Sequence, residues 1–148
     1  MRTTVHRTDP WKVNQRAAPK PRVLLIDDEA AIARILKRLL RDYEVVHVSS
    51  AVEALTLLSR EEFPVIFCDL ALPGGLDGIE LHGIVERELA PLQDRFIFLT
   101  GGSASNRARD FFERVHNLCI DKPFTADEIR AAVDEAAGLY ATTRADAG

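Results

Sequence analysis

The chain has 148 residues, of which 47% are hydrophobic and 28% are charged, and its net charge at pH 7 is −4. This size and mixture are typical of one globular domain with its own core, and they exclude a mainly disordered chain. The apolar runs are too short for a membrane span and the N-terminus lacks the apolar stretch of a secretion signal, so we expect a cytoplasmic protein with no membrane contact.

The first 21 residues predict a flexible basic leader ahead of the folded part. They contain Pro10, Pro19 and Pro21 and show no hydrophobic periodicity. Six of the first 22 residues are Lys or Arg against one Asp, so the rest of the chain is acidic overall. An acidic body argues against direct binding of nucleic acid by the domain.

From residue 22 to about residue 140, short apolar runs alternate with stretches of helical periodicity. The runs predict strands at 23–26, 43–48, 65–68, 96–99 and 118–120, and the stretches after them predict helices. Capping boxes mark the starts of three helices, at Ser50 with Glu53, Asp77 with Glu80, and Thr125 with Glu128. Residues 141–148 predict a frayed tail.

This alternation predicts an α/β fold of the (βα)5 type, in which helices cover both faces of a doubly wound parallel sheet. Ligands bind such sheets beyond the carboxyl ends of the strands. Polar side chains stand at those ends: Asp27 and Asp28 after the first strand, Asp69 after the third, Thr100 after the fourth, and Asp121 with Lys122 after the fifth.

Three carboxylates on one edge repel one another, and a divalent cation is the natural compensation. Oxygen ligands suit Mg²⁺, with Mn²⁺ as a substitute. A carboxylate beside such a cation, together with the Thr100 hydroxyl and the Lys122 ammonium, suits phosphoryl transfer, because the carboxylate attacks phosphorus while the cations neutralise its oxygens.

Four motifs carry a resemblance to a known family. They are Leu25-Ile26-Asp27-Asp28-Glu29, Cys68-Asp69 with Pro73 and Asp77-Gly78, Leu99-Thr100-Gly101, and Asp121-Lys122-Pro123-Phe124. In this order, and over residues 22–140, they resemble the receiver domain of bacterial two-component response regulators, similar to the single-domain chemotaxis regulator. The resemblance implies a flavodoxin-like five-stranded sheet with strand order 2-1-3-4-5.

The resemblance also implies a role for each residue of the edge. Asp69 is the phosphoacceptor, Thr100 donates a hydrogen bond to the phosphoryl group, and Lys122 pairs with it through a loop in which the Lys122–Pro123 peptide bond is cis. Mg²⁺ is then bound directly by Asp28 and Asp69, by Asp27 through water, and by the backbone carbonyl of Ala71.

The implied phosphodonor is a phosphohistidine on a histidine kinase or a histidine phosphotransfer protein. The domain would catalyse its own phosphorylation and dephosphorylation, which makes it a switch rather than a turnover enzyme. No effector segment follows residue 140, so output would pass through contacts with an unknown protein target if the chain is complete. The last helix-strand-helix face is the expected contact surface and a possible homodimer interface.

Two other functions compete with this interpretation. A phosphatase of the haloacid-dehalogenase type also places Asp, Thr and Lys around Mg²⁺, but it needs a second Asp two residues after its nucleophile. Glu29 stands in that position after Asp27, and Ala71 stands there after Asp69. The second alternative is a pseudo-receiver that acts only as a protein-interaction module.

The sequence departs from the family pattern at several positions. Cys119 stands three residues before the lysine, where the family usually has an aromatic ring. Gly78 follows Asp69 by nine residues rather than the usual eight, and Ala71 and Gly102 are small where water would approach. Both Cys68 and Cys119 are predicted to be buried reduced thiols, whereas His82 and His116 are predicted on the surfaces of helices.

Overall fold

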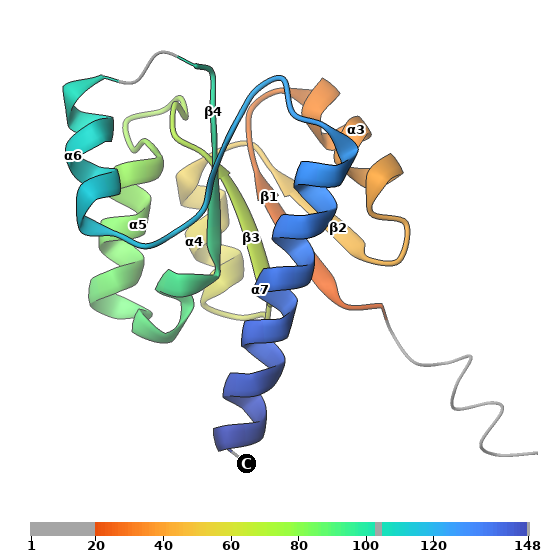
Figure 1. The fold of residues 1–148 in the computed structure, drawn as a ribbon. Helices are drawn as coiled ribbons and strands as arrows, with labels where there is room; N and C mark the ends of the chain where they lie inside the picture. The colour runs from red at the N-terminus through yellow and green to blue at the C-terminus, as the bar shows by residue number, and fades with distance from the viewer. Residues whose placement is uncertain (1–19, 103–104, 148) are drawn as a thin grey trace, which may run out of the picture.

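The computed structural model describes residues 20–102 and 105–147. Its centre is a five-stranded sheet with the order β2-β1-β3-β4-β5, in which all neighbouring strands are parallel (Figure 1). The strands are β1 (Arg22–Ile26), β2 (Glu44–Val48), β3 (Val65–Asp69), β4 (Phe96–Thr100) and β5 (Cys119–Asp121). The predicted flavodoxin-like α/β fold and its strand order are confirmed.

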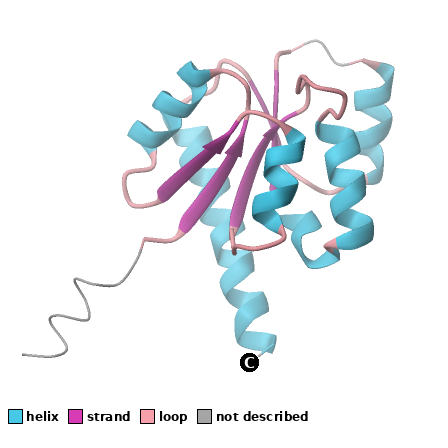
Figure 2. Cartoon of the chain, turned by 180° about the vertical axis from the view of Figure 1, so that it is seen from behind, coloured by secondary structure: helices cyan, strands magenta, loops and turns pink. Residues whose placement is uncertain are grey.

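Helices cover both faces of this sheet (Figures 1 and 2). Helices α3 (Ala30–Leu39) and α7 (Ala126–Ala147) pack on one face. Helices α4 (Ala51–Leu58), α5 (Gly78–Glu88) and α6 (Asn106–Arg114) pack on the other. A short 3-10 helix, η1 (Ala90–Arg95), joins α5 to β4 and was not predicted. None of the helices in the described part of the chain is long and apolar enough to cross a membrane.

The continuous apolar runs are explained by burial on both faces. In β1, Leu24 and Ile26 pack into the core beneath α4, α5 and α6, whereas Val23 and Leu25 pack beneath α3 and α7. Since neighbouring side chains of a strand point to opposite faces, both sets must be apolar. The sheet therefore has no polar face, and its polar side chains collect at the strand ends.

Side-chain caps fix where three of the helices begin, as the sequence predicts. The Asp77 carboxylate accepts from the amide of Glu80, whose side chain accepts in return from the amide of Asp77. Thr125 and Glu128 form the same reciprocal pair. At the start of α4, Ser50 accepts from the amide of Glu53, while the Glu53 carboxylate accepts from the amide of Ser49 and the hydroxyl of Ser50.

Helix α7 continues through Ala147, so the tail predicted as frayed is helical to that residue. The reason lies in its composition, because residues 141–147 contain neither Pro nor Gly to end the helix. At the other terminus, the predicted flexible leader lies outside the described residues as far as residue 19, and Ala104 of the predicted helical stripe lies outside them as well.

The prediction that His82 lies on the surface is wrong. Its ring is buried on the inner side of α5 and makes edge contacts with Phe96, Phe98 and Phe111. The His82 Nε2 lies 3.1 Å from the carbonyl oxygen of Gln93 in η1, which satisfies the polar end of the ring. His116 is exposed, as predicted, but it follows α6 in a loop rather than lying on a helix.

Candidate functional site

The carboxyl ends of the parallel strands bring the predicted acidic residues together. Asp69 is the last residue of β3, and Asp27 and Asp28 directly follow β1, the neighbour of β3 in the sheet. One carboxylate oxygen of each of these three residues lies within 4.8 Å of the others. The structure therefore forms the cluster that the sequence predicts.

Lys122 provides the positive charge of the cluster. Its Nζ donates to Asp27 Oδ2 and Glu29 Oε1, each at 2.9 Å, and to Asp69 Oδ2 at 3.2 Å. Burial lowers the pKa of Lys122, but the hydrogen bonds to Glu29 and Asp27 and the charge of Asp69 outweigh burial and raise this pKa above the usual value. The following peptide bond, Lys122–Pro123, is cis.

Backbone amides hold the second oxygen of two of these carboxylates. Asp27 Oδ1 accepts from the amide of Glu29 at 2.8 Å, and Asp69 Oδ1 accepts from the amide of Ala71 at 3.0 Å. Burial raises the pKa of Asp69, and the Ala71 amide and the Lys122 ammonium act in the opposite direction. Both carboxylates thus have fixed orientations, and Asp69 keeps little contact with water.

The donor set fits a small divalent cation. Asp28 is exposed and has no hydrogen-bond or ion-pair partner within residues 20–102 and 105–147, although it stands beside the buried Asp27 and Asp69. A group of carboxylate oxygens with one member free is chemically suited to Mg²⁺, which takes oxygen ligands and retains several waters. Lys122 satisfies only part of the negative charge of this group.

Gly78 sets the position of Asp69 by allowing a very close approach between α5 and β3. A Cβ on Gly78 would lie 2.6 Å from the carbonyl oxygen of Asp69 and 2.9 Å from the Cα of Leu70. The Gly78 amide donates to the carbonyl of Leu70 at 2.9 Å. The extra loop residue is accommodated ahead of this junction, where Gly74 and Gly75 both have positive φ.

Thr100 has a hydrogen-bond partner outside the acidic cluster. Its hydroxyl donates to Asp121 Oδ1 at 2.8 Å, across the β4–β5 pair in which these two residues are register partners. Thr100 and Asp69 both line a cavity of about 410 Å³ that extends between α5 and α6 to Phe112. The structure thus places Thr100 beside the acidic cluster without bonding it to the cluster.

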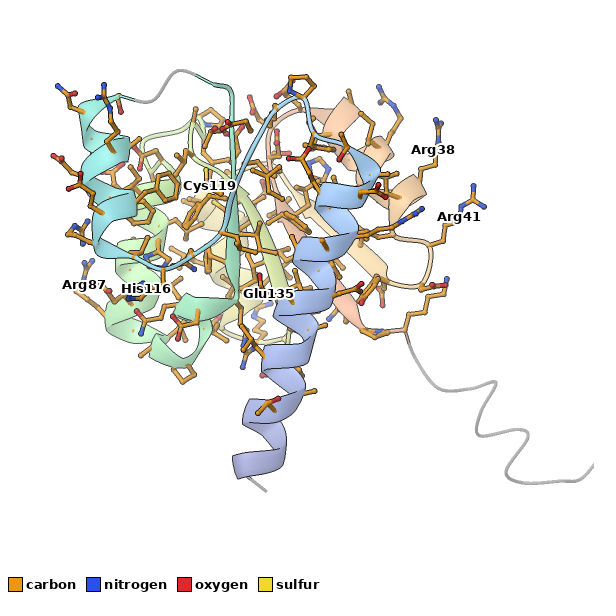
Figure 3. The ribbon with its side chains drawn as sticks, viewed as in Figure 1. Arg38, Arg41, Arg87, His116, Cys119 and Glu135 are labelled. Atoms are coloured by element: carbon orange, nitrogen blue, oxygen red, sulfur yellow. The ribbon has the colours of Figure 1, made fainter. Side chains whose placement is uncertain are left out.

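Of the two cysteines, only Cys68 is buried as predicted. Cys119 is exposed and lines the cavity (Figure 3 labels it on the segment between α6 and α7). The prediction for Cys119 is wrong because this residue faces the cavity, whereas its neighbour Ile120 points to the opposite face of β5 and is buried in the core beneath α7. Desolvation by the surrounding protein and the charge of Asp121 raise the pKa of the Cys119 thiol, and its interaction with the Thr100 hydroxyl acts in the opposite direction.

Sequence reasoning missed three contacts around the site. His47 Nε2 lies 2.6 Å from the carbonyl oxygen of Asp27, so the histidine of β2 helps to fix the loop after β1. Glu29 shares Lys122 with the Asp residues. Arg107, near the start of α6, forms an ion pair with Asp77, the N-cap of α5, beside the cavity. Each contact joins residues that are distant in the sequence, so only the packing of the strands, helices and loops places these groups together.

The fold and the site together define a class, the receiver domains of signalling proteins. Residues 23–134 match the family described as the response regulator receiver domain, and the chain therefore belongs to this family. Such domains are signalling switches and generally bind Mg²⁺ at their acidic pocket. This assignment does not favour the haloacid-dehalogenase or pseudo-receiver alternatives.

Several characterised regulators are similar to this chain. The alginate biosynthesis transcriptional regulatory protein AlgB of Pseudomonas aeruginosa is 36% identical over 113 residues, which are 75% of this chain and 24% of that protein. AlgB of Pseudomonas putida is 34% identical over 113 residues, 75% of this chain and 25% of its own length. The chain thus spans about a quarter of the length of these relatives.

Solved receiver structures share the fold. A CheY-like response regulator receiver domain from Methanospirillum hungatei is 27% identical with a TM-score of 0.73, covering 84% of this chain and 98% of that one. A response regulator receiver domain from Clostridium thermocellum is 25% identical with a TM-score of 0.72, covering 83% of this chain and 98% of that one.

Proposed function

We propose that this receiver domain accepts a phosphoryl group on Asp69 in a Mg²⁺-dependent reaction of a two-component phosphorelay. The observation that carries the proposal is the environment of Asp69. It is a buried carboxylate at the end of β3, with one oxygen fixed by a backbone amide and the other by the Lys122 ammonium at 3.2 Å, among carboxylates that suit a divalent cation.

The phosphodonor is a phosphohistidine on a histidine kinase or a histidine phosphotransfer protein. An Asp69 carboxylate oxygen attacks phosphorus, a P–O bond forms, and the P–N bond breaks with its electron pair remaining on the imidazole of the donor. In the reverse phase, water attacks phosphorus and returns Asp69 to a carboxylate with release of inorganic phosphate. The domain itself provides the groups for both steps, so it works as a self-resetting switch.

The other residues of the edge have supporting roles in this proposal. Asp28 and Asp69 bind Mg²⁺ directly, Asp27 binds it through water, and the Ala71 carbonyl supplies a further oxygen. When bound, Mg²⁺ neutralises charge on the phosphoryl oxygens. The Lys122 ammonium, already within hydrogen-bond distance of Asp69, pairs with one phosphoryl oxygen.

The output of the switch is a change in protein contacts in the cytoplasm. The surface that we propose for it consists of α6, β5 and α7, which adjoin Thr100 and the cavity and which also offer a route to a homodimer. The relatives named as transcriptional regulatory proteins are about four times longer than their match to this chain, so their DNA-directed activity belongs to those proteins.

Incubation with Mg²⁺ and acetyl phosphate, followed by intact-mass measurement, tests the proposal. We expect the mass of one phosphoryl group to be added, and EDTA or Asp69→Asn to prevent the addition. Asp110→Asn is the matched control, because Asp110 is an exposed aspartate of α6 without a hydrogen-bond partner in the described ranges. A folded, Mg²⁺-binding protein that gains no mass would contradict the proposal.

A further inference from the structure

The carboxylate of Asp121 accepts the hydrogen bond of the Thr100 hydroxyl, which is the donor that a phosphoryl group on Asp69 would need. Thr100 Oγ1 donates to Asp121 Oδ1 at 2.8 Å, and no hydrogen bond joins Thr100 to Asp69 in the part of the chain that the structure describes. The pairing is dictated by the sheet. Thr100 and Asp121 are register partners on adjacent parallel strands, and partners in register point to the same face.

A threonine hydroxyl has one proton, so it donates to one acceptor at a time. A phosphoryl group on Asp69 and the carboxylate of Asp121 therefore compete for the same donor. We propose that Asp121 is a positioning residue of the phosphoryl reaction: it retains the Thr100 hydroxyl in the unphosphorylated domain and must release it before Thr100 can stabilise the phosphorylated one. This inference rests on the proposed function of Asp69.

The surroundings of the pair allow this exchange. Asp69, Thr100 and Asp121 all line the cavity of about 410 Å³, so the hydroxyl and both acceptors face the same space. Cys119, which precedes Asp121 by two residues on the same face of β5, is small and lines the same cavity. The Cys119 thiol also interacts with the Thr100 hydroxyl, so the residue that faces Thr100 at position 119 is a small thiol and not an aromatic ring.

Release of Thr100 is inexpensive for Asp121 because this residue is exposed and water replaces the lost donor. The coupling is reciprocal. Whatever binds the Asp121 carboxylate in place of Thr100 favours phosphorylation, and phosphorylation frees this carboxylate at the exposed edge of the sheet.

The test compares Asp121→Ala, which removes the acceptor, with Asp121→Asn, which retains a side-chain oxygen. The probe is beryllium fluoride with Mg²⁺, an analogue of the phosphoryl group, and binding is followed by the fluorine NMR signal of the bound probe, which every variant retains. We expect Asp121→Ala to bind the probe about three- to ten-fold more tightly than wild type, the range that corresponds to one ordinary hydrogen bond. Asp121→Asn should remain close to wild type.

Two controls separate this role from a general effect of charge or folding. Asp110→Ala removes an equivalent exposed charge from α6 and should leave the affinity unchanged. In a Thr100→Ala background, Asp121→Ala should have no effect, because the double-mutant cycle then lacks the interacting hydroxyl. Acetyl phosphate phosphorylation rates of the same variants should follow the same order.

The outcomes distinguish the two proposals. Suppose that wild type is phosphorylated on Asp69. The role of Asp121 is then overturned if Asp121→Ala binds the probe with wild-type affinity, or if Asp121→Ala raises the affinity equally in the Thr100→Ala background, and the function of Asp69 stands in both cases. If wild type accepts neither the probe nor a phosphoryl group while still binding Mg²⁺, both proposals fail. Tighter binding by Asp121→Ala, dependent on Thr100, supports the inference.

Discussion

Substitution of Gly78 by Ala tests how strictly the start of α5 is fixed against the end of β3. The new Cβ would lie 2.6 Å from the carbonyl oxygen of Asp69 and 2.9 Å from the Cα of Leu70. Both neighbours are backbone atoms, so no side-chain rotation relieves the overlap. Helix α5 cannot withdraw without weakening the hydrogen bond from the Gly78 amide to the Leu70 carbonyl at 2.9 Å.

The expected cost follows from these contacts. Overpacking of a tight site costs about 1–3 kcal/mol, and weakening one backbone hydrogen bond adds about 1 kcal/mol. Alanine recovers up to about 1 kcal/mol through its helix propensity. We therefore expect Gly78→Ala to lower the free energy of unfolding by about 1–4 kcal/mol, and to slow phosphorylation of Asp69, because the strand end that carries this carboxylate must shift.

Gly83 provides a matched control in the same helix. A Cβ there would meet only the mobile end of Arg87, at 3.6 Å. Gly83→Ala should therefore raise the free energy of unfolding by about 0.5–1 kcal/mol, with phosphorylation unchanged.

Urea unfolding followed by circular dichroism measures both variants, and equal m-values would show that the comparison is sound. A Gly78→Ala variant within about 0.5 kcal/mol of wild type would show that the junction between α5 and β3 moves freely, which contradicts a fixed contact.

Two further substitutions test the buried polar groups. Burial lowers the pKa of His82 from 6.5, so as the pH falls the unfolded chain binds a proton before the folded chain does. The free energy of unfolding should therefore decline as the pH falls below 6.5. Urea unfolding at several pH values should show a smaller decline in His82→Gln than in the control variant His116→Gln. Lys122→Met leaves Asp27 and Asp69 without their shared cation, and in EDTA it should lower the free energy of unfolding by about 2–4 kcal/mol. Mg²⁺ should raise the thermal midpoint more in Lys122→Met than in wild type, and an equal rise would contradict the view that ammonium and metal ion compensate the same charges.

The fold was predictable because its determinants are local in the sequence. The apolar run at the start of the domain indicates a strand that is buried on both faces, as β1 is. The capping boxes of Asp77 and Thr125 mark helix starts through hydrogen bonds between residues that are three positions apart. His82 was misplaced for the opposite reason. A polar residue in a helix is assigned to the surface by its type, and only the packing of α5 against three phenylalanine rings explains its burial.

The members of the site were predictable, but their pairing was not. Parallel strands place all the polar strand ends on one edge whatever the register, which is why the sequence predicts that Asp69, Thr100 and Lys122 lie near one another. The bond from Thr100 to Asp121 depends on the register of β4 with β5, and the exposure of Cys119 depends on the cavity that its face of β5 lines. Neither property is encoded by a residue pattern within one segment.

Lys122 shows how the topology adds function to these local patterns. It lies 95 residues from Asp27 in the chain, and two strands, β3 and β4, separate β5 from β1 in the sheet. Strands are about 4.8 Å apart, so the separation of β5 from β1 exceeds the reach of a lysine side chain held in the strand. The loop after β5 must therefore bring Lys122 back over the edge of the sheet. The Lys122 ammonium then contacts carboxylates from the loop after β1 and from the end of β3. Because Lys122 joins these groups, a change of charge at Asp69 affects both the loop after β1 and the loop after β5.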